Sequence, residues 1–311
     1  MTSRHVCRMQ TVHGFVARGF AGVRDAFVAN LEHHGDVGAA CAVYSAGKPV
    51  VDVWAGFADL VCGRLWAEDT VQLVFSATKG ITATCVNLLA ERRAIDIDAP
   101  IAAYWAEFGA RGKDRIPIRW ALSHKAGLAA VDGDLTLADV LAWRPVVDAI
   151  AAQAPNWEPG TAHGYHARSF GWILGELVRR VTGRSIGRFF ADEIAGPLGL
   201  DFWIGVPRET LPRCARIIPP EDMPSLAALF GPGSLMARVM NGPSGLFAYD
   251  DMWNRPDVLQ AEMPSSNGVG SARALARFYA ALVGEVDGIR VLAPDTVQAS
   301  CVVQSEGADR V

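Results

Sequence analysis

The hydrophobic period of the sequence changes at one point, and this change constrains the fold more than any other feature. Residues 71–75 (VQLVF) form a short apolar run that is typical of a strand. After Val74 the apolar residues recur at helical spacing and predict a helix that runs to about Arg93. Its apolar face contains Ile81, Cys85, Leu88 and Leu89. A strand therefore leads directly into a helix, and Ser76 opens that helix.

Ser76 and Lys79 form an S-x-x-K pair on this predicted helix. Residues three apart lie on one helix face, so the hydroxyl and the ammonium can touch. The helix N-terminus offers unpaired N–H groups and a positive dipole end, which favour negative charge developing there. A lysine held against apolar groups loses proton affinity and can act as a base towards a serine. Equally, Ser76 could be only an N-cap and Lys79 a solvated residue of the first turn.

A second S-x-x-K pair, Ser45 and Lys48, shows that the bare pattern is weak. It lies between two strand-like runs over residues 37–58, which predict a β-hairpin with Gly47 at the bend. Serine and lysine are ordinary solvent-facing residues in such a turn. We therefore interpret Ser45 as a turn residue and not as a nucleophile.

The other periodic segments predict an α+β protein. Helices are expected over 17–33, 169–181, 185–196 with a stop at Gly196–Pro197, and 271–283 before Gly284. A short strand is expected near 62–66, and Thr136 with Asp139 has a capping-box pattern. Residues 205–268 are rich in proline and glycine and are expected to be irregular.

Composition excludes several classes of function. The net charge of −4 and the absence of a basic stripe argue against nucleic acid and anionic membrane surfaces as partners. No run approaches the ~20 apolar residues of a membrane span. The N-terminal residues 1–14 contain no apolar segment. We therefore expect no secretory signal and a cytoplasmic location. The six scattered cysteines are expected to be free buried thiols and not metal ligands.

Three ordered segments resemble the serine β-lactamase/penicillin-binding superfamily, in its class C-like branch and closest to family VIII carboxylesterases. The first runs from "VFSATKG" to "ALSHKAGL" (residues 74–128), the second is "WEPGTAHGYHARSFGW" from Trp157, and the third is "NGVGSARALARFYAAL" (267–282). The resemblance extends from about Gly14 to the end. Met9 resembles the start of the matching region, so residues 1–8 are expected to be an extension.

The resemblance implies a site and a fold. Ser76 matches the nucleophile, Lys79 its base partner and Tyr165 the catalytic tyrosine, and the Ser76 N–H is one oxyanion donor. The implied fold is β-lactamase/transpeptidase-like. It has an antiparallel sheet flanked by helices (1–75 with 260–311) and a mostly helical domain (76–259). The implied reaction hydrolyses a small-molecule ester through an acyl-serine, with no cofactor.

Near these residues the sequence departs from the family pattern. The β-lactamase motif Y-x-N is replaced by Tyr165-His166-Ala167, which argues against efficient β-lactam hydrolysis. Lys125 stands where the family usually has threonine, and we interpret it as peripheral. His166, together with His124 and Trp157, is a candidate for lining the substrate pocket. A metal site is not expected, because His163 and His166 have no third ligand nearby.

The family's third motif, a Lys-Thr-Gly or a His/Trp-x-Gly variant, is absent. No lysine follows Lys125, no histidine follows His166, and Trp253 is followed by Asn-Arg. Relatives pair late strands with the N-terminal hairpin, so the sheet is expected to be incomplete, with an open edge and an exposed apolar face. Either the chain is shortened or a partner, such as a second copy, covers the edge.

Three functional hypotheses remain. The first is a serine carboxylesterase that acts on short-acyl esters. The second is a catalytically impaired scaffold or binding protein of the same fold, because the absent motif supplies the second oxyanion N–H in relatives. The third is a β-lactamase or an enzyme directed at D-amino-acid peptides. The sequence does not specify the natural ester, its acyl length or its stereochemistry.

Overall fold

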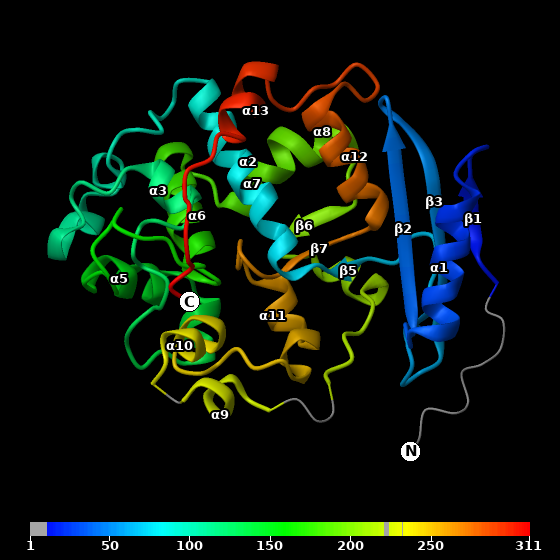
Figure 1. Ribbon diagram of the computed structural model, residues 1–311, viewed down its shortest axis with the longest axis horizontal. Helices are drawn as coiled ribbons and strands as arrows, with labels where there is room; N and C mark the ends of the chain where they lie inside the picture. The colour runs from blue at the N-terminus through cyan, green and yellow to red at the C-terminus, as the bar shows by residue number, and fades with distance from the viewer. Residues whose placement is uncertain (1–10, 221–223, 232) are drawn as a thin grey trace.

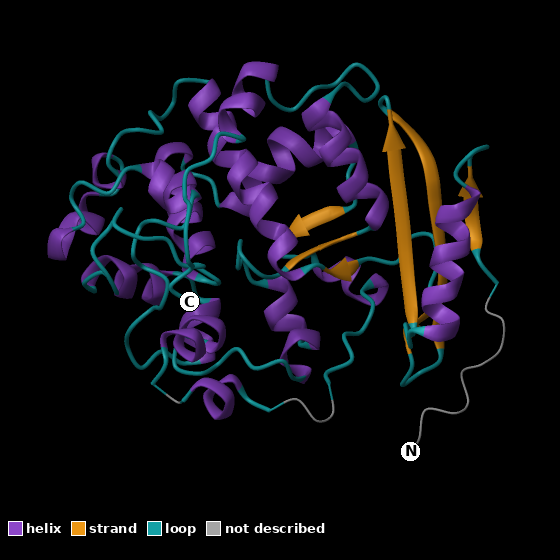
Figure 2. Ribbon diagram, in the orientation of Figure 1, coloured by secondary structure: helices purple, strands orange, loops and turns teal. Residues whose placement is uncertain are grey.

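The computed structural model describes residues 11–220, 224–231 and 233–311, and places a sheet at one side of a larger helical body (Figures 1 and 2). The predicted extension over residues 1–8 lies outside the described residues. The observed architecture, antiparallel sheets flanked by helices, confirms the α+β prediction.

The first sheet is built around the predicted hairpin. Strands β2 (Gly38–Ser45) and β3 (Lys48–Asp59) pair antiparallel, with Ser45 opposite Lys48. Gly47 has a φ of +75°, and a Cβ there would lie 2.2 Å from the Glu285 carbonyl oxygen, so the bend requires glycine. The sheet order is β1-β3-β2, with β1 spanning His13–Val16, and β4 (Arg64–Leu65) also pairs with β3. Within the described residues, no strand pairs with the outer edge of β2.

Helices cover both faces of this sheet. On one face, Phe27 of α1 (Ala21–His33) packs with Val51, Val53 and Ala55 in a core cluster. The prediction that this helix begins at residue 17 was wrong, because residues 13–16 pair with β3 and a turn follows before Ala21. On the other face lies α12 (Ala272–Val283), whose Arg273 forms an ion pair with Asp52 of β3 at 2.5 Å (Figure 1).

A second antiparallel sheet lies inside the helical body and was not predicted. Its order is β5-β7-β6, with β5 at Gln72–Leu73, β7 at Gly268–Gly270 and β6 at Phe202–Ile204. β5 lies within the apolar run 71–75 that predicts a strand, while β6 and β7 have only three residues each, too few to produce an alternating pattern. A Cβ on Gly268 would lie 2.5 Å from the Thr78 hydroxyl, so this glycine allows β7 to pass directly against the helix that follows Ser76.

The helical body is organised around α2 (Thr78–Glu91) and α6 (Ser169–Thr182), which pack together (Figure 1). The apolar face predicted for each helix is buried, except for Val181 at the end of α6. The other helices of this region are α3 (Ile118–Leu122), α4 (Leu137–Leu141), α5 (Arg144–Ala152), α9 (Leu226–Phe230), α10 (Leu235–Asn241), α11 (Pro256–Gln260) and α13 (Pro294–Ser300). The Thr136–Asp139 capping box begins α4 as predicted.

The predicted end of one helix at Gly196–Pro197 was wrong. Helix α7 (Ile186–Phe190) continues through a π-helical turn at Ala191–Ala195 into α8 (Gly196–Leu198) and ends at Gly199, whose φ is +61°. A proline lacks the N–H that would close the preceding helical turn. The wider π turn places Pro197 at the start of a new turn, where no such bond is needed.

The described cysteines correct the prediction of free buried thiols in part. Cys41, Cys62, Cys85, Cys214 and Cys301 are free, as expected. Only Cys85 is fully buried, while Cys62 lies exposed in the turn after β3 and Cys301 lies exposed after α13. Within the described part of the chain, every helix falls short of the length or the apolarity that a membrane crossing requires.

Candidate active site

Ser76 lies where β5 turns into α2. The connecting segment is a 3-10 turn, Phe75–Ala77, and Phe75 has a φ of +46°, an uncommon and strained conformation for an aromatic residue. The Phe75 ring packs edge-on against Trp253, with centroids 5.2 Å apart, which holds the turn in place. As a result Ser76 is exposed at the start of a helix whose first N–H groups are directed towards it.

The Ser76 hydroxyl does not act as a helix cap. Neither the 3-10 turn nor α2 has a side-chain cap, and Thr78 instead donates to the Phe75 carbonyl at 2.5 Å and accepts from the Gly268 N–H at 2.9 Å. Ser76 Oγ accepts hydrogen bonds from Lys79 Nζ at 3.1 Å and from Tyr165 Oη at 2.6 Å. The N-cap interpretation of Ser76 was therefore wrong.

Lys79 is held in a buried, carboxylate-free setting. Its side chain is 9% exposed, and Nζ donates to the carbonyl oxygens of Ala167 at 2.8 Å and Ser265 at 3.0 Å, in addition to Ser76 Oγ. Burial, and next the positive charge of Arg168, lower the pKa of Lys79 to about 7. The interpretation of Lys79 as a solvated first-turn residue was wrong, since the side chain is buried and Nζ is bound to two carbonyl oxygens.

Tyr165 completes a cluster of the three predicted catalytic side chains. It lies in the loop before α6, and its ring centroid is 4.8 Å from Lys79 Nζ. The Tyr165 backbone N–H donates to Asp309 Oδ1 at 3.1 Å. Asp309 was missed in the sequence because its contact spans 144 residues and no local pattern marks it. The carboxylate fixes the loop that carries the phenol.

The three predicted pocket residues surround the Tyr165 loop. His166 is fully buried: its Nε2 accepts from the Leu128 N–H at 3.0 Å, so its Nδ1 carries the proton and donates to the Gly164 carbonyl at 2.6 Å. Trp157 is also buried and donates to the Ala162 carbonyl at 3.2 Å. These contacts brace the loop, and His166 has no exposed surface to offer a ligand.

His124 is the partly exposed member of this group. Its ring lies 5.2 Å from the Tyr165 ring, and its Nδ1 accepts the His166 N–H at 3.1 Å. Burial, and next the charge of Lys79, lower the pKa of His124 to about 4, so the ring is neutral at pH 7. Its other nitrogen then carries a proton and can donate to a bound group. Lys125 lies further out, with Nζ 3.4 Å from the Gln304 carbonyl oxygen.

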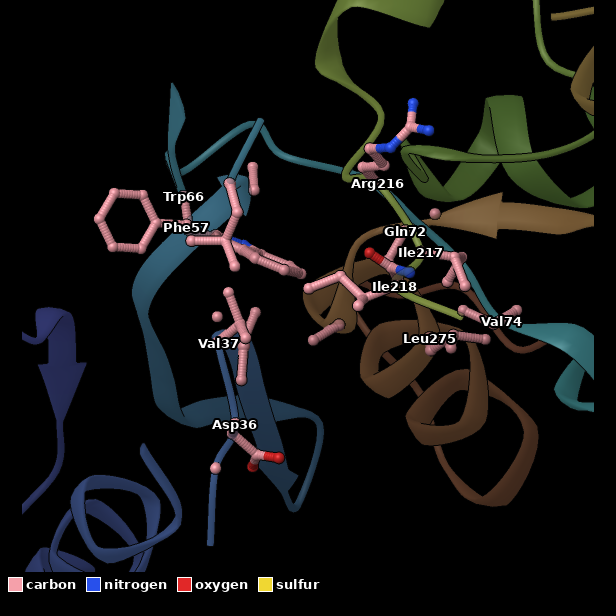
Figure 3. A pocket seen from close by; sticks show the side chains of 18 residues that line it. Asp36, Val37, Phe57, Trp66, Gln72, Val74, Arg216, Ile217, Ile218 and Leu275 are labelled. Atoms are coloured by element: carbon pink, nitrogen blue, oxygen red, sulfur yellow. The ribbon is translucent and has the colours of Figure 1, made fainter. Parts of the chain in front are cut away.

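A cavity of about 540 Å³ lies between the two sheets (Figure 3). Its lining includes Phe57, Trp66, Ile217 and Leu275, and it reaches Val74 but none of the three clustered side chains. Ile218, another lining residue, is 54% exposed. An apolar face is therefore open next to the unpaired edge of β2. In the described residues, no group of three His, Cys, Asp or Glu side chains is arranged to hold a metal ion.

Comparison with known proteins identifies the family. The sequence matches the beta-lactamase family over residues 23–309. The chain belongs to the beta-lactamase family. This membership confirms the superfamily resemblance, and the β-lactamase-like fold of the solved relatives confirms the predicted fold.

Several members of the beta-lactamase family resemble this chain over most of its length. The esterase/beta-lactamase LipL of Mycobacterium tuberculosis is 40% identical over 297 residues, which cover 92% of this chain and 68% of LipL. A family VIII carboxylesterase of known structure has a TM-score of 0.80 at 37% identity, covering 93% of this chain and 76% of its own. A penicillin-binding protein homologue from Caulobacter crescentus has a TM-score of 0.85 at 32% identity, covering 97% and 80%. The chain is a hydrolase of the esterase/beta-lactamase type, and its likeness to family VIII carboxylesterases is confirmed.

Proposed function

We propose that this protein is a serine carboxylesterase that cleaves short-acyl esters of small alcohols or phenols through an acyl-Ser76 intermediate. The observation that carries the proposal is the convergence of Lys79 Nζ and Tyr165 Oη on Ser76 Oγ, at 3.1 and 2.6 Å. The named activities of LipL and of the family VIII carboxylesterase support the choice of an ester as substrate.

Lys79 is the proton acceptor in the proposed acylation step. In its neutral form it keeps two N–H donors for the Ala167 and Ser265 carbonyls and has one lone pair free for the Ser76 proton. Ser76 Oγ attacks the ester carbonyl carbon as its proton passes to Lys79 Nζ. The Ser76 backbone N–H, at the helix N-terminus, stabilises the oxyanion that forms.

Tyr165 then acts as the general acid. Its hydroxyl donates a proton to the leaving alcohol oxygen and regains one from the Lys79 ammonium, so the C–O bond breaks without releasing a free alkoxide. In the second step a water molecule gives a proton to Lys79 and attacks the acyl carbon. Ser76 leaves with a proton returned from Lys79, which restores the starting state.

Hydrolysis of p-nitrophenyl acetate and butyrate tests the proposal. We expect Ser76→Ala to abolish turnover and Tyr165→Phe to lower kcat by about 10²- to 10⁴-fold, the usual contribution of a positioned general acid or base. Ser45→Ala is the matched control, because it changes the other S-x-x-K serine, which is exposed in the hairpin turn. Equal hydrolysis by the wild type and Ser76→Ala would contradict the proposal.

The intact mass after treatment with a fluorophosphonate probe identifies the reactive serine independently of turnover. We expect one adduct, lost in Ser76→Ala and kept in Ser45→Ala. A folded protein that neither reacts nor hydrolyses either ester would favour the catalytically impaired binding protein. Nitrocefin belongs in the same assay, because the name of LipL includes a β-lactamase. We expect little turnover of nitrocefin, since Ala167 supplies no side-chain amide.

A further inference from the structure

Arg168 is a buried cation that the proposed hydrolysis does not use. It lies three residues after Tyr165, at the start of α6, and is 7% exposed. Its guanidinium donates to Ser266 Oγ at 2.7 Å and to the Met240 carbonyl at 3.2 Å, while the Nε hydrogen has no partner. The rest of the group is covered by two aromatic rings, Phe247 at 4.8 Å and Trp253 at 5.0 Å. Among the described residues, its hydrogen-bond partners are all neutral.

Such a charge is costly to bury. A desolvated cation without a carboxylate partner loses hydration that neutral hydrogen bonds and ring faces replace only in part. Where buried ionic groups have been replaced by apolar side chains of similar volume, proteins have often become more stable. Packing therefore does not explain why the site contains an arginine.

Arg168 and Lys79 are anchored to the same two short segments. Lys79 Nζ donates to the carbonyl oxygens of Ala167 and Ser265, the residues next to Arg168 and Ser266. The segments are joined by Ser265 Oγ, which donates to the Arg168 carbonyl at 2.9 Å. Ser265 and Ser266 are both buried. The two cations are therefore held by the same buried segments, where little water is present to screen the repulsion between like charges.

The other groups that face Lys79 do not offset this repulsion. Its immediate neighbours are the hydroxyl groups of Ser76 and Tyr165, the ring of Phe170 and the neutral imidazole of His124. His166 lies behind His124 and is neutral as well. The Asp309 carboxylate accepts from the Tyr165 backbone N–H and acts on His124 and His166, whereas the pKa of Lys79 is lowered by burial and by Arg168. Arg168 is thus the fixed charge that acts on Lys79 within the described residues.

We propose that Arg168 is a positioning residue whose unpaired charge adds to the effect of burial and favours the neutral, proton-accepting form of Lys79. The proposal rests on the proposed function, because it assigns Lys79 as the base towards Ser76. It also makes a statement about the lysine itself, which can be tested without measuring hydrolysis.

The direct test is an NMR titration of the lysine side chains, labelled with ¹³C at Cε. The chain has four lysines, so the Lys79 signal can be assigned with Lys79→Met. In Arg168→Met we expect the titration midpoint of Lys79 to rise by on the order of one pH unit. Arg168→Lys should leave the Lys79 midpoint near the wild-type value over the pH range in which the ¹³Cε signal of the added lysine shows that it is protonated. Lys113, a buried lysine bound to backbone carbonyls elsewhere, is the internal control and should not move.

For the same variants, kcat/KM is also measured against pH. The pH at which kcat/KM falls on the acid side of the profile should rise together with the Lys79 midpoint. Arg168→Gln serves as a second neutral variant if Arg168→Met does not fold. An unchanged Lys79 midpoint in a folded neutral variant would overturn the proposal, and so would an equal shift in Arg168→Lys while the added lysine is protonated. If Ser76 proves unreactive while the midpoint still shifts, the proposed function fails and the electrostatic role of Arg168 stands.

Discussion

At the scale of single residues, the site depends on Lys79, which is buried and in the proposed mechanism both accepts and returns a proton. Its ammonium form has three acceptors, Ser76 Oγ and the carbonyls of Ala167 and Ser265, so it remains anchored when protonated. Its neutral form is favoured by burial and by the charge of Arg168. Both forms are therefore accessible near neutral pH, which a residue that accepts and returns a proton requires.

The pH dependence of hydrolysis follows from this balance. Lys79 has to be unprotonated to accept the Ser76 proton, and its pKa is lowered to about 7. We therefore expect kcat/KM for p-nitrophenyl butyrate to fall about tenfold per pH unit below 7 and to level off above it. Initial rates between pH 5 and 9 measure the profile. A profile that is flat from pH 5 to 7 would contradict Lys79 as the base.

At the scale of elements, α6 and the segment around Ser265 pack so closely that their contact sets the position of the Lys79 acceptors. A Cβ on Gly171 would lie 2.4 Å from the Ser265 backbone nitrogen and 2.7 Å from the Pro264 carbonyl carbon. The Gly171 N–H also donates to Ser265 Oγ at 2.6 Å. Glycine here permits a helix to touch backbone, and the site depends on that approach.

Gly171→Ala tests this contact. We expect a loss of about 1–3 kcal/mol in the free energy of unfolding, as for other overpacked sites. We also expect a lower kcat, because the Ser265 carbonyl that binds Lys79 has to move. Urea denaturation followed by circular dichroism gives the stability. The control is Gly22→Ala in α1, where a Cβ meets no heavy atom within 4 Å, and its stability should be unchanged or slightly higher. Equal stability of the two variants would refute the packing argument.

At the scale of the whole molecule, the two sheets belong to different core clusters. The face of the first sheet that α1 covers forms its own cluster with Phe27, while Leu73 and Val269 of the second sheet join the large cluster with Ile81 of α2. The proposed division into 1–75 with 260–311 and 76–259 stays a prediction. The large cluster contains side chains from both parts.

The open edge of β2 and the apolar cavity beside it lead us to expect self-association. A second copy that covered this face would remove water from Ile218 and its neighbours and protect the strand edge. Sedimentation velocity over a range of concentrations should show reversible dimers, which Ile218→Lys weakens. Leu229→Lys is the control, since Leu229 is similarly exposed, at 57%, but lies on α9. A monomer at every concentration tested would contradict the expectation.

The sequence by itself determined the elements that depend on local sequence patterns. The hairpin at Gly47, the helix that follows Ser76, the stripe of α6 and the capping box at Thr136 each depend on periodicity or on a turn residue, and each is present. The resemblance to a known family added Tyr165, which periodicity alone would not have selected. The grouping of Ser76, Lys79 and Tyr165 as catalytic residues remains a prediction that their geometry supports.

Only the tertiary structure decided the features that depend on contacts between distant segments. Two of the three strands of the second sheet, β6 and β7, are too short to have a pattern. The partners of Lys79 are carbonyl oxygens, which any residue could supply. Asp309 and Arg168 act through position and not through a motif. A backbone oxygen or a buried charge acquires its effect from what surrounds it. Those surroundings exist only after the chain has folded.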